Sequence, residues 1–222
     1  MRKFLKSNEV IELLKDIKER EDIFYDRNNH TLYNYNLENK QNNLLRLPLA
    51  WPVIDDWKNY IDLDRKFIFV IVIIQAGQAT IGVFNQNLDV FEHKVLRTYM
   101  VRKKQGKSQL KYLKTKGKSR AGSRIRLKNT YLFFEDINIY LQRWFKEYSV
   151  DRIIYHIPTM MKNLWKSSKV DIPFDLDSEK CLKSPFNIKS PTFEEMKKIA
   201  KFSLDGEIKN EIVIGEKCLK YC

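Results

Sequence analysis

The apolar run from Phe67 to Ile74 limits the possible folds more than any other part of the sequence. Within Lys66–Gln75 (KFIFVIVIIQ), β-branched and aromatic residues follow one another without alternating with polar ones. This pattern is typical of a strand that is buried on both faces. Other elements must therefore cover both sides of the sheet that contains it. The run is also far too short to span a membrane.

Turn residues separate this strand from further segments with strand or helix character. Strands are predicted over Ala79–Phe84, Leu88–Glu92, Lys94–Lys103, Asp151–Ile157 and Ile212–Ile214. Helices are predicted over Ala121–Tyr148, Pro158–Lys166 and Thr192–Phe202, where apolar residues recur at helical spacing. Short links join antiparallel neighbours. The order predicts an α/β fold, with antiparallel strands followed by strand–helix units in a mixed sheet, similar to the ribonuclease H-like arrangement.

The first part of the chain differs in composition from the rest. Apolar residues at helical spacing predict a helix over residues 4–18. The Asn-rich stretch Asn28–Asn43 is interpreted as a poorly ordered connector or an extended arm. We therefore expect residues 1–48 to hold this helix and connector, and residues 49–222 to form the main domain. Near the end of that domain, Ser190 is a candidate N-cap, with Pro191 at the first helical position.

The positive charge is concentrated in one segment. The chain has 41 Lys and Arg against 28 Asp and Glu, a formal net charge of +13, yet His93–Phe134 holds fourteen cations and no carboxylate. The other residues together carry −1. A cluster of this kind repels itself unless a polyanion neutralises it, and nucleic acid is the usual partner. Residues 104–120 hold few apolar side chains, so we expect a long, flexible basic loop there; a solvated loop is the alternative.

Several other kinds of chemistry have little support. The run Phe67–Ile74 offers no carboxylate, although a two-metal nuclease of this fold class places one in its first strand. The three histidines are scattered, and His156 within a predicted strand is interpreted as a satisfied core residue. Cys181, Cys218 and Cys222 cannot form a disulfide framework. We expect no cofactor and no metal, no membrane association, and a reduced cytoplasmic environment.

Ordered motifs flank and fill the basic segment. Val101-Arg102-Lys103-Lys104 is followed by Gly106-Lys107-Ser108-Gln109 and then by Ala121-Gly122-Ser123-Arg124-Ile125-Arg126. Ser184-Pro185-Phe186 and Lys189-Ser190-Pro191-Thr192-Phe193-Glu194-Glu195 come later. In this order they resemble the release-factor-like domain of the Vms and ankyrin–zinc-finger peptidyl-tRNA hydrolases. That domain is itself similar to the catalytic middle domain of eukaryotic and archaeal peptide-chain release factors.

The resemblance covers roughly Trp51–Phe202 and is that of a stand-alone prokaryotic relative. The sequence departs from the family pattern at Arg120, where a serine is common, and at Leu127 and Lys128, where a second arginine and an aromatic residue are common. The core motifs are nevertheless present and in order.

The resemblance implies a function in ribosome rescue. It implies that Gln109 is catalytic in the peptidyl-transferase centre of the large ribosomal subunit, with Gly106 and Ser108 supporting the loop. The RNA-binding residues would be Arg102, Lys103, Lys104, Lys107, Lys111, Lys114, Lys116, Lys118, Arg120, Arg124, Arg126 and Lys128. The partners would be the large subunit, ribosomal RNA and peptidyl-tRNA, met by a monomer.

The resemblance leaves two reactions open, hydrolysis of the peptidyl ester and endonucleolytic removal of the terminal CCA of the tRNA. Two other classes of function remain as alternatives. One is a non-catalytic ribosome- or RNA-binding protein that retains the basic loop. The other is a ribonuclease that acts on free RNA.

Overall fold

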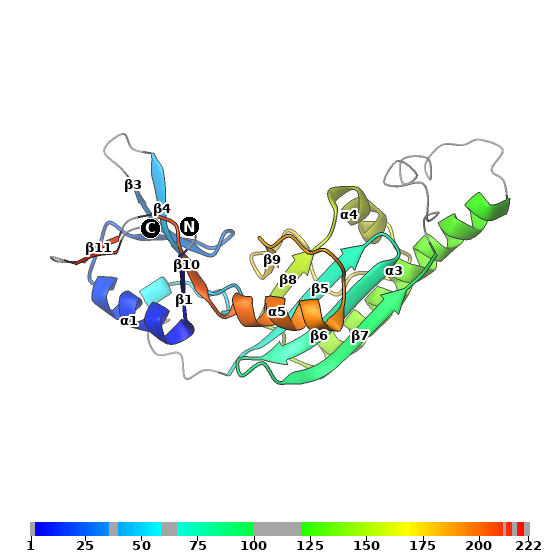
Figure 1. Ribbon diagram of the computed structural model, residues 1–222, viewed down its shortest axis with the longest axis horizontal. Helices are drawn as coiled ribbons and strands as arrows, with labels where there is room; N and C mark the ends of the chain where they lie inside the picture. Colours follow the sequence, from blue (N-terminus) through cyan, green and yellow to red (C-terminus); the bar gives the residue numbers. More distant parts are fainter. Residues whose placement is uncertain are drawn as a thin grey trace.

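The apolar run forms β5 (Ile68–Gln75), whose six interior residues are all buried, at the centre of a five-stranded sheet. The computed structural model describes residues 3–35, 40–58, 66–99, 121–210, 212–214 and 217–219 (Figure 1). The strand order is β7-β6-β5-β8-β9. We call this the central sheet. Its other strands are β6 (Gln78–Asn85), β7 (Val90–Arg97), β8 (Arg152–His156) and β9 (Cys181–Lys183).

The direction of the strands confirms the predicted fold class. β6 is antiparallel to both β5 and β7, whereas β8 is parallel to β5 and β9 is parallel to β8. A mixed sheet with three antiparallel strands followed by parallel strand–helix units is the ribonuclease H-like arrangement that the element order predicted.

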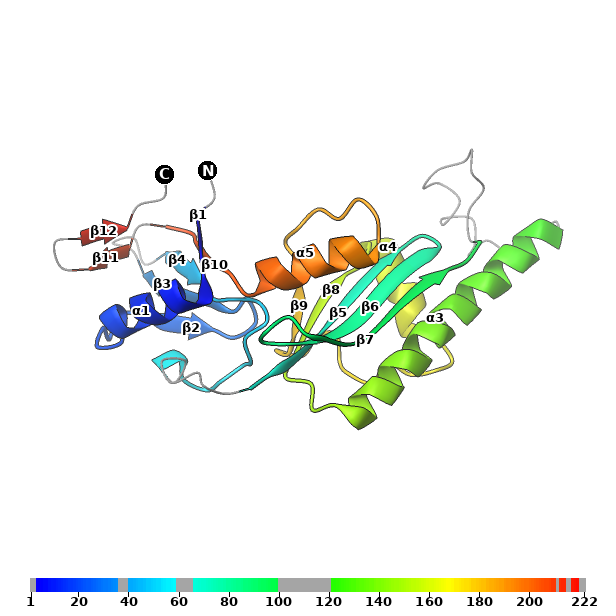
Figure 2. The same ribbon diagram turned by 60° about the horizontal axis from the view of Figure 1, so that its bottom comes forward.

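Helices cover both faces of the central sheet. One face packs against α3 (Ala121–Glu147) and α4 (Thr159–Lys166), where Val70 and Val72 share a core cluster with Phe134, Ile137 and Trp144. The other face packs against α5 (Phe193–Ser203), whose Met196 and Ile199 share a cluster with the opposite side chains of β5. Figure 2 shows α3 and α5 on opposite sides of the sheet. None of the helices described here is long and apolar enough to cross a bilayer.

A second five-stranded sheet, which we call the N-terminal sheet, has the order β1-β10-β4-β3-β2. Its strands are β1 (Lys3–Leu5), β2 (Phe24–Asp26), β3 (Thr31–Tyr35), β4 (Gln41–Arg46) and β10 (Gly206–Ile208). Helix α1 (Ser7–Ile17) buries Val10, Leu13, Leu14 and Ile17 in the core cluster that also holds Phe69 of β5. A two-stranded antiparallel hairpin, β11 (Ile212–Ile214) with β12 (Lys217–Leu219), follows.

The structure differs from the sequence-based expectations at several elements. The stretch expected as a connector contributes β3 and β4, which pair as an antiparallel hairpin. The strands expected over Leu88–Glu92 and Lys94–Lys103 are joined in one strand, β7, which stays paired with β6 through a register shift at Val83/Phe84. Residues 100–103 of the second expected strand lie outside the described residues. β9 was not predicted, since three residues carry no periodicity. The N-cap of α5 is Thr192, whose hydroxyl accepts a hydrogen bond from the Glu195 amide at 3.2 Å.

An irregularity in β4 allows two consecutive leucines to face the core of the N-terminal sheet. Leu32 pairs with Leu45 and Tyr33 with Asn43, so Leu44 is the extra residue of a β-bulge. Leu44 and Leu45 are both buried in the core shared with α1. Beyond the bulge, Tyr33 and Asn43 point away from that core. The bulge thereby places two consecutive leucines on one face without exposing either.

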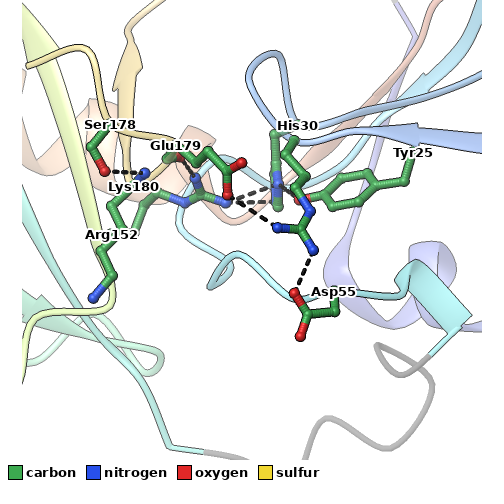
Figure 3. A network of polar contacts seen from close by, with 8 residues as sticks. Tyr25, His30, Asp55, Arg152, Ser178, Glu179 and Lys180 are labelled. Carbon is green, nitrogen blue, oxygen red and sulfur yellow. Dashed lines mark hydrogen bonds and ion pairs between the residues drawn. The ribbon is translucent and has the colours of Figure 1, made fainter.

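A buried arginine links the two sheets (Figure 3). Arg152, at the start of β8, is 0% exposed. Its Nε donates a hydrogen bond to the Trp51 carbonyl at 2.7 Å and Nη1 donates to the Glu179 carbonyl at 2.7 Å. Its Nη2 lies 2.8 Å from Nδ1 of His30, which ends the turn between β2 and β3 and has a positive φ of 53°. The guanidinium thus ties the central sheet to the N-terminal sheet and to two loops.

His30 is held neutral by this environment. Burial lowers its pKa well below the ordinary value, and the neighbouring charges of Arg152 and Arg46 lower it further. Nδ1 is within hydrogen-bond distance of both the Tyr25 hydroxyl, at 2.6 Å, and Arg152. Because these two groups donate, Nδ1 acts as the acceptor and the ring proton resides on Nε2.

Replacing Arg152 with Met should lower the free energy of unfolding by about 3 kcal/mol, because two buried carbonyls and His30 lose a donor. Urea unfolding followed by tryptophan fluorescence measures the effect. Arg143→Met is the matched control. Arg143 is 48% exposed and pairs with Glu92 and Glu147 on the surface, so its loss should cost less than about 1 kcal/mol. Equal losses for the two variants would contradict the structural importance of Arg152.

The neutral state of His30 predicts a pH dependence of stability. The unfolded chain binds a proton at this residue below about pH 6.5, whereas the folded chain does not, so protons favour unfolding. The contribution of neutral His30 to the free energy of unfolding is complete above the pKa of this residue in the unfolded chain, and it is lost as the pH falls below that value. His30→Asn removes the titration and keeps a residue that tolerates the left-handed conformation. Between pH 7 and 5, the parent should lose more stability than the variant, by up to about 1.4 kcal/mol per pH unit; parallel curves would refute this.

Candidate functional site

Four strands of the central sheet end at the same edge. β7 and β5 are each antiparallel to β6, so they share a direction, and β8 and β9 run parallel to β5. We call the edge at which these four strands end the carboxyl edge. In open α/β sheets, ligands bind outside the carboxyl ends of the strands. The carboxyl edge is therefore where the fold favours a functional site.

The predicted basic loop begins and ends beside this edge. It follows β7, which ends at Arg97, and it precedes α3, which begins at Ala121. Gln109, Gly106, Ser108 and the candidate RNA-binding residues from Arg102 to Arg120 lie outside the described residues. The backbone of α3 places Arg124 and Arg126 within its first two turns, and Lys128 is exposed.

Hydrogen bonds hold the strand that leads to the basic loop. The Thr98 amide donates to the Gly77 carbonyl at 2.8 Å, so the first residue after β7 is held beside the turn between β5 and β6. The Asn129 side chain donates to the Tyr99 carbonyl at 3.4 Å, which joins this strand to α3. The described ends of the loop are thus fixed to the scaffold, and rigid elements position functional groups better than loops do.

Further contacts brace α3 against β7 along its length. The ammonium group of Lys94 lies over the Tyr140 ring, 5.1 Å from its centroid. Arg143 forms an ion pair with Glu92 at 3.0 Å. These side chains come from the half-buried face of β7 and from the middle of α3, so the helix is held while its first turns extend past the sheet (Figure 2).

The second sequence motif, Ser184–Thr192, lies at the same carboxyl edge. Gln75, the last residue of β5, donates its side-chain amide to the Ile188 carbonyl at 2.7 Å. The Thr80 hydroxyl, near the start of β6, donates to the Pro191 carbonyl at 2.5 Å. The Ser184 amide donates to the Tyr155 carbonyl of β8 at 2.8 Å. Two motifs that are about eighty residues apart in the sequence therefore adjoin one edge of the sheet.

The electrostatics at the start of α3 favour an anion. The first turn of the helix contains no acidic residue, and the helix dipole already places partial positive charge at this end. Arg124 and Arg126 in these turns add to that charge. A polyanion such as RNA would relieve this repulsion by neutralising both sources of positive charge.

The titratable groups near the edge do not form a nucleophilic or metal site. His156, the last residue of β8, is half-buried, and burial followed by the charge of Lys183 lowers its pKa. Its buried Nδ1 has no hydrogen-bond partner among the described residues, so the expectation of a satisfied histidine is not met. Burial raises the pKa of the Cys181 thiol to about 12, and its Sγ lies 3.0 Å from the Asp175 carbonyl. No group of three or more metal-ligating side chains occurs in the described part of the chain.

Sequence reasoning did not identify Gln75, Thr80 or Lys183 as residues of this edge. Gln75 and Thr80 act by holding the Ser184–Thr192 segment, and Lys183 ends a strand too short to be predicted. The signal available for Gln75 was a polar residue that ends an apolar strand. The sequence contains no comparable signal for Lys183.

Comparison with known proteins places the chain in a family. No curated protein matches it. Among solved structures, one titled "Vms1 mitochondrial localization core" is similar, at 13% sequence identity and a TM-score of 0.49, with 92% of this chain and 99% of that chain covered. A family model described as Bacteroidetes VLRF1 release factor matches residues 69–211, which is more than half of the chain. This match confirms the predicted release-factor-like resemblance, and the protein belongs to the Bacteroidetes VLRF1 release factor family.

Proposed function

We propose that this protein releases nascent chains from peptidyl-tRNA on stalled large ribosomal subunits, and that Gln109 is its catalytic residue. The observation that carries the proposal is the family match over 69–211, which includes the whole basic segment and its Gly-x-x-Gln sequence. The protein would act in the cytoplasm as a monomer. Its partners would be the large subunit, ribosomal RNA and peptidyl-tRNA.

The chemistry of Gln109 would be orientation rather than proton transfer. A carboxamide does not titrate, so it is a poor general base. It can position a water molecule or a ribose hydroxyl, while backbone N–H groups stabilise the oxyanion that develops. Gly106 gives the loop conformational freedom for a close approach to RNA, and Ser108 adds a hydroxyl beside the catalytic residue.

Two reactions fit this arrangement. In ester hydrolysis, water attacks the carbonyl carbon that joins the peptide to the tRNA, and the products are a peptide carboxylate and an intact tRNA 3′ hydroxyl. In tRNA cleavage, a ribose 2′ hydroxyl attacks the adjacent phosphodiester, which leaves a cyclic phosphate on the shortened tRNA and the CCA on the peptide. Neither reaction requires a protein-bound metal.

The cations of the basic segment would supply affinity without reading sequence. Lys and Arg side chains bind phosphates of ribosomal RNA and tRNA, and counterion release provides the driving force. The carboxyl edge supports this assignment, since it anchors both described ends of the segment next to a helix start that lacks acidic residues.

An assay on purified peptidyl-tRNA–large-subunit complexes, with the 3′ end of the RNA product mapped, tests the proposal. Release with intact tRNA would identify ester hydrolysis, and release with tRNA that lacks CCA would identify the nuclease reaction. Binding without any release would refute the enzymatic proposal and favour a non-catalytic ribosome-binding protein.

Replacing Gln109 with Ala should reduce the release rate at least about a hundredfold, because an orienting group contributes on that scale. Binding to the large subunit should change little, since one neutral side chain adds little among many phosphate contacts. Gln105→Ala is the matched control, because it removes the same side chain four residues earlier, outside the Gly-x-x-Gln sequence. Release at the parental rate by the Gln109 variant would exclude the catalytic assignment.

Binding to the large subunit should weaken steeply with salt. If about six of the clustered cations contact phosphate, the slope of log affinity against log salt is roughly −4 to −5. Replacing Arg120, Arg124 and Arg126 with Ala should make the slope less steep by about 2 to 3. The matched control removes the same charge at three exposed residues, Lys15 of α1, Lys18 directly after α1, and Lys201 of α5. Filter binding at several salt concentrations measures both, and an identical slope for the two triple variants would exclude phosphate contacts at the start of α3.

A further inference from the structure

The outer face of the N-terminal sheet carries three aromatic rings that contact one another. Phe24 of β2 and Tyr33 and Tyr35 of β3 have ring centroids 5.7 to 5.8 Å apart in all three pairings. Phe24 is 44% exposed and Tyr35 is 54% exposed. We call these rings the aromatic triad. Large apolar side chains gathered on one exposed face are a feature of binding surfaces.

Amide side chains lie directly across the strand from the triad. Asn43 pairs with Tyr33, and Gln41 pairs with Tyr35, so both amides belong to the same face. Gln41 donates a hydrogen bond to Asn43 at 3.0 Å, which holds the two side chains together. Each amide offers both a donor and an acceptor, which matches the edges of nucleobases.

A cationic cavity of about 400 Å³ adjoins this face. It lies between the N-terminal sheet and edge strand β9 of the central sheet, and its lining includes Asn43, Arg46, Lys183 and Lys209. No carboxylate is among the described residues that line it. Asn43 pairs with Tyr33 of the aromatic triad and also lines the cavity, so the cavity is next to the triad.

One nearby carboxylate offsets part of this positive charge. Glu207 forms hydrogen bonds with Arg46 at 3.1 Å and with Lys209 at 2.8 Å. Burial raises the pKa of Glu207, but these hydrogen bonds outweigh it and lower the pKa overall, so the group is ionised. Three cations against one carboxylate leave the cavity net positive, and a phosphate would balance it.

A second cavity, of about 910 Å³, has the opposite character. Asp55, Asp175, Asp177 and Glu179 line it together with the cations Arg27 and Lys180. An excess of carboxylates disfavours phosphate. The charge therefore distinguishes the two cavities and assigns an anionic ligand to the one next to the triad.

We propose that the aromatic triad and the cationic cavity together bind single-stranded RNA. Bases stack on Phe24, Tyr33 and Tyr35, the amides of Gln41 and Asn43 bond to base edges, and the cavity takes a phosphate of the same strand. Exposed rings on a sheet, next to cations, are how proteins bind unpaired nucleotides. This contact is additional to the basic segment, since Figures 1 and 2 place the N-terminal sheet and the start of α3 at opposite ends of the molecule.

The test compares two labelled oligonucleotides of about ten nucleotides, a single-stranded RNA and an abasic strand of the same length. They carry the same phosphates, so the basic segment should bind the phosphates of both alike, and only contacts with the bases distinguish them. By fluorescence polarisation, the parent should bind the RNA at least about tenfold more tightly than the abasic strand. The double variant Phe24→Ala/Tyr35→Ala should lose that preference and keep the salt dependence of the parent.

Two variants serve as controls. Tyr35→Phe retains the ring and should retain the preference. Phe91→Ala removes another exposed aromatic residue, which stacks on Tyr148 at 5.5 Å on the central sheet, and should also leave the preference unchanged. The oligonucleotide test does not depend on the release assay on large subunits. If Gln109 proves not to be catalytic, the result of the oligonucleotide test is still valid.

Four results would overturn the proposal. The parent could bind both strands equally, or the double variant could keep the preference. The parent could also form a dimer in sedimentation velocity that the double variant abolishes, which would identify the face as a protein interface. Photocrosslinking of the parent protein to a single-stranded RNA that contains 4-thiouridine provides a further measurement that needs no variant. Crosslinks within residues 24–35 or 41–46 support the proposal, and crosslinks confined to other regions contradict it.

Discussion

Neither face of β5 can be left in water, and this requirement determines what the other elements do. The Val70 and Val72 side is covered by α3 and α4, and the Phe69 and Ile71 side by α5. Helix α5 alone does not complete the second layer, because Leu45 and Trp51 of the N-terminal part belong to the same core cluster. The N-terminal sheet is therefore a structural component of the same fold as the central sheet, and Arg152 joins the two sheets at the point where β8 begins.

The distribution of charge complements this packing. Outside His93–Phe134 the chain is nearly neutral, so its sheets and helices assemble without strong repulsion. Of this segment, the described parts are the strand β7, which ends at the carboxyl edge, and the first half of α3. Because the excess cations are confined to one segment of the sequence, the rest of the chain can form an apolar interior.

The sequence predicts the central sheet and its helices well, because β5 and α3 are long and their patterns are unambiguous. It does not predict the N-terminal sheet. β1, β2 and β10 have three residues each, and the pairing of β10 with β1 and β4 joins segments at opposite ends of the sequence. The bulge at Leu44 shifts the faces of β4 by one residue, so that Gln41 and Asn43 share the face of the aromatic triad. Tyr33 and Tyr35 could be seen in the Asn-rich stretch, but their shared exposed face could not.

The place of β10 has a consequence for how the chain folds as it is made. β1 and β4 emerge early in synthesis, but the strand that separates them follows the entire central sheet. The start of β10 at Gly206 is 160 residues after the end of β4 at Arg46, which at typical elongation rates takes about 8 to 32 s. During that time α1 and the β3–β4 hairpin have an open edge where β10 will insert, and the buried Arg46–Glu207 pair cannot form. The N-terminal sheet is thus completed late, because it can form in full only after nearly all of the described chain has been translated.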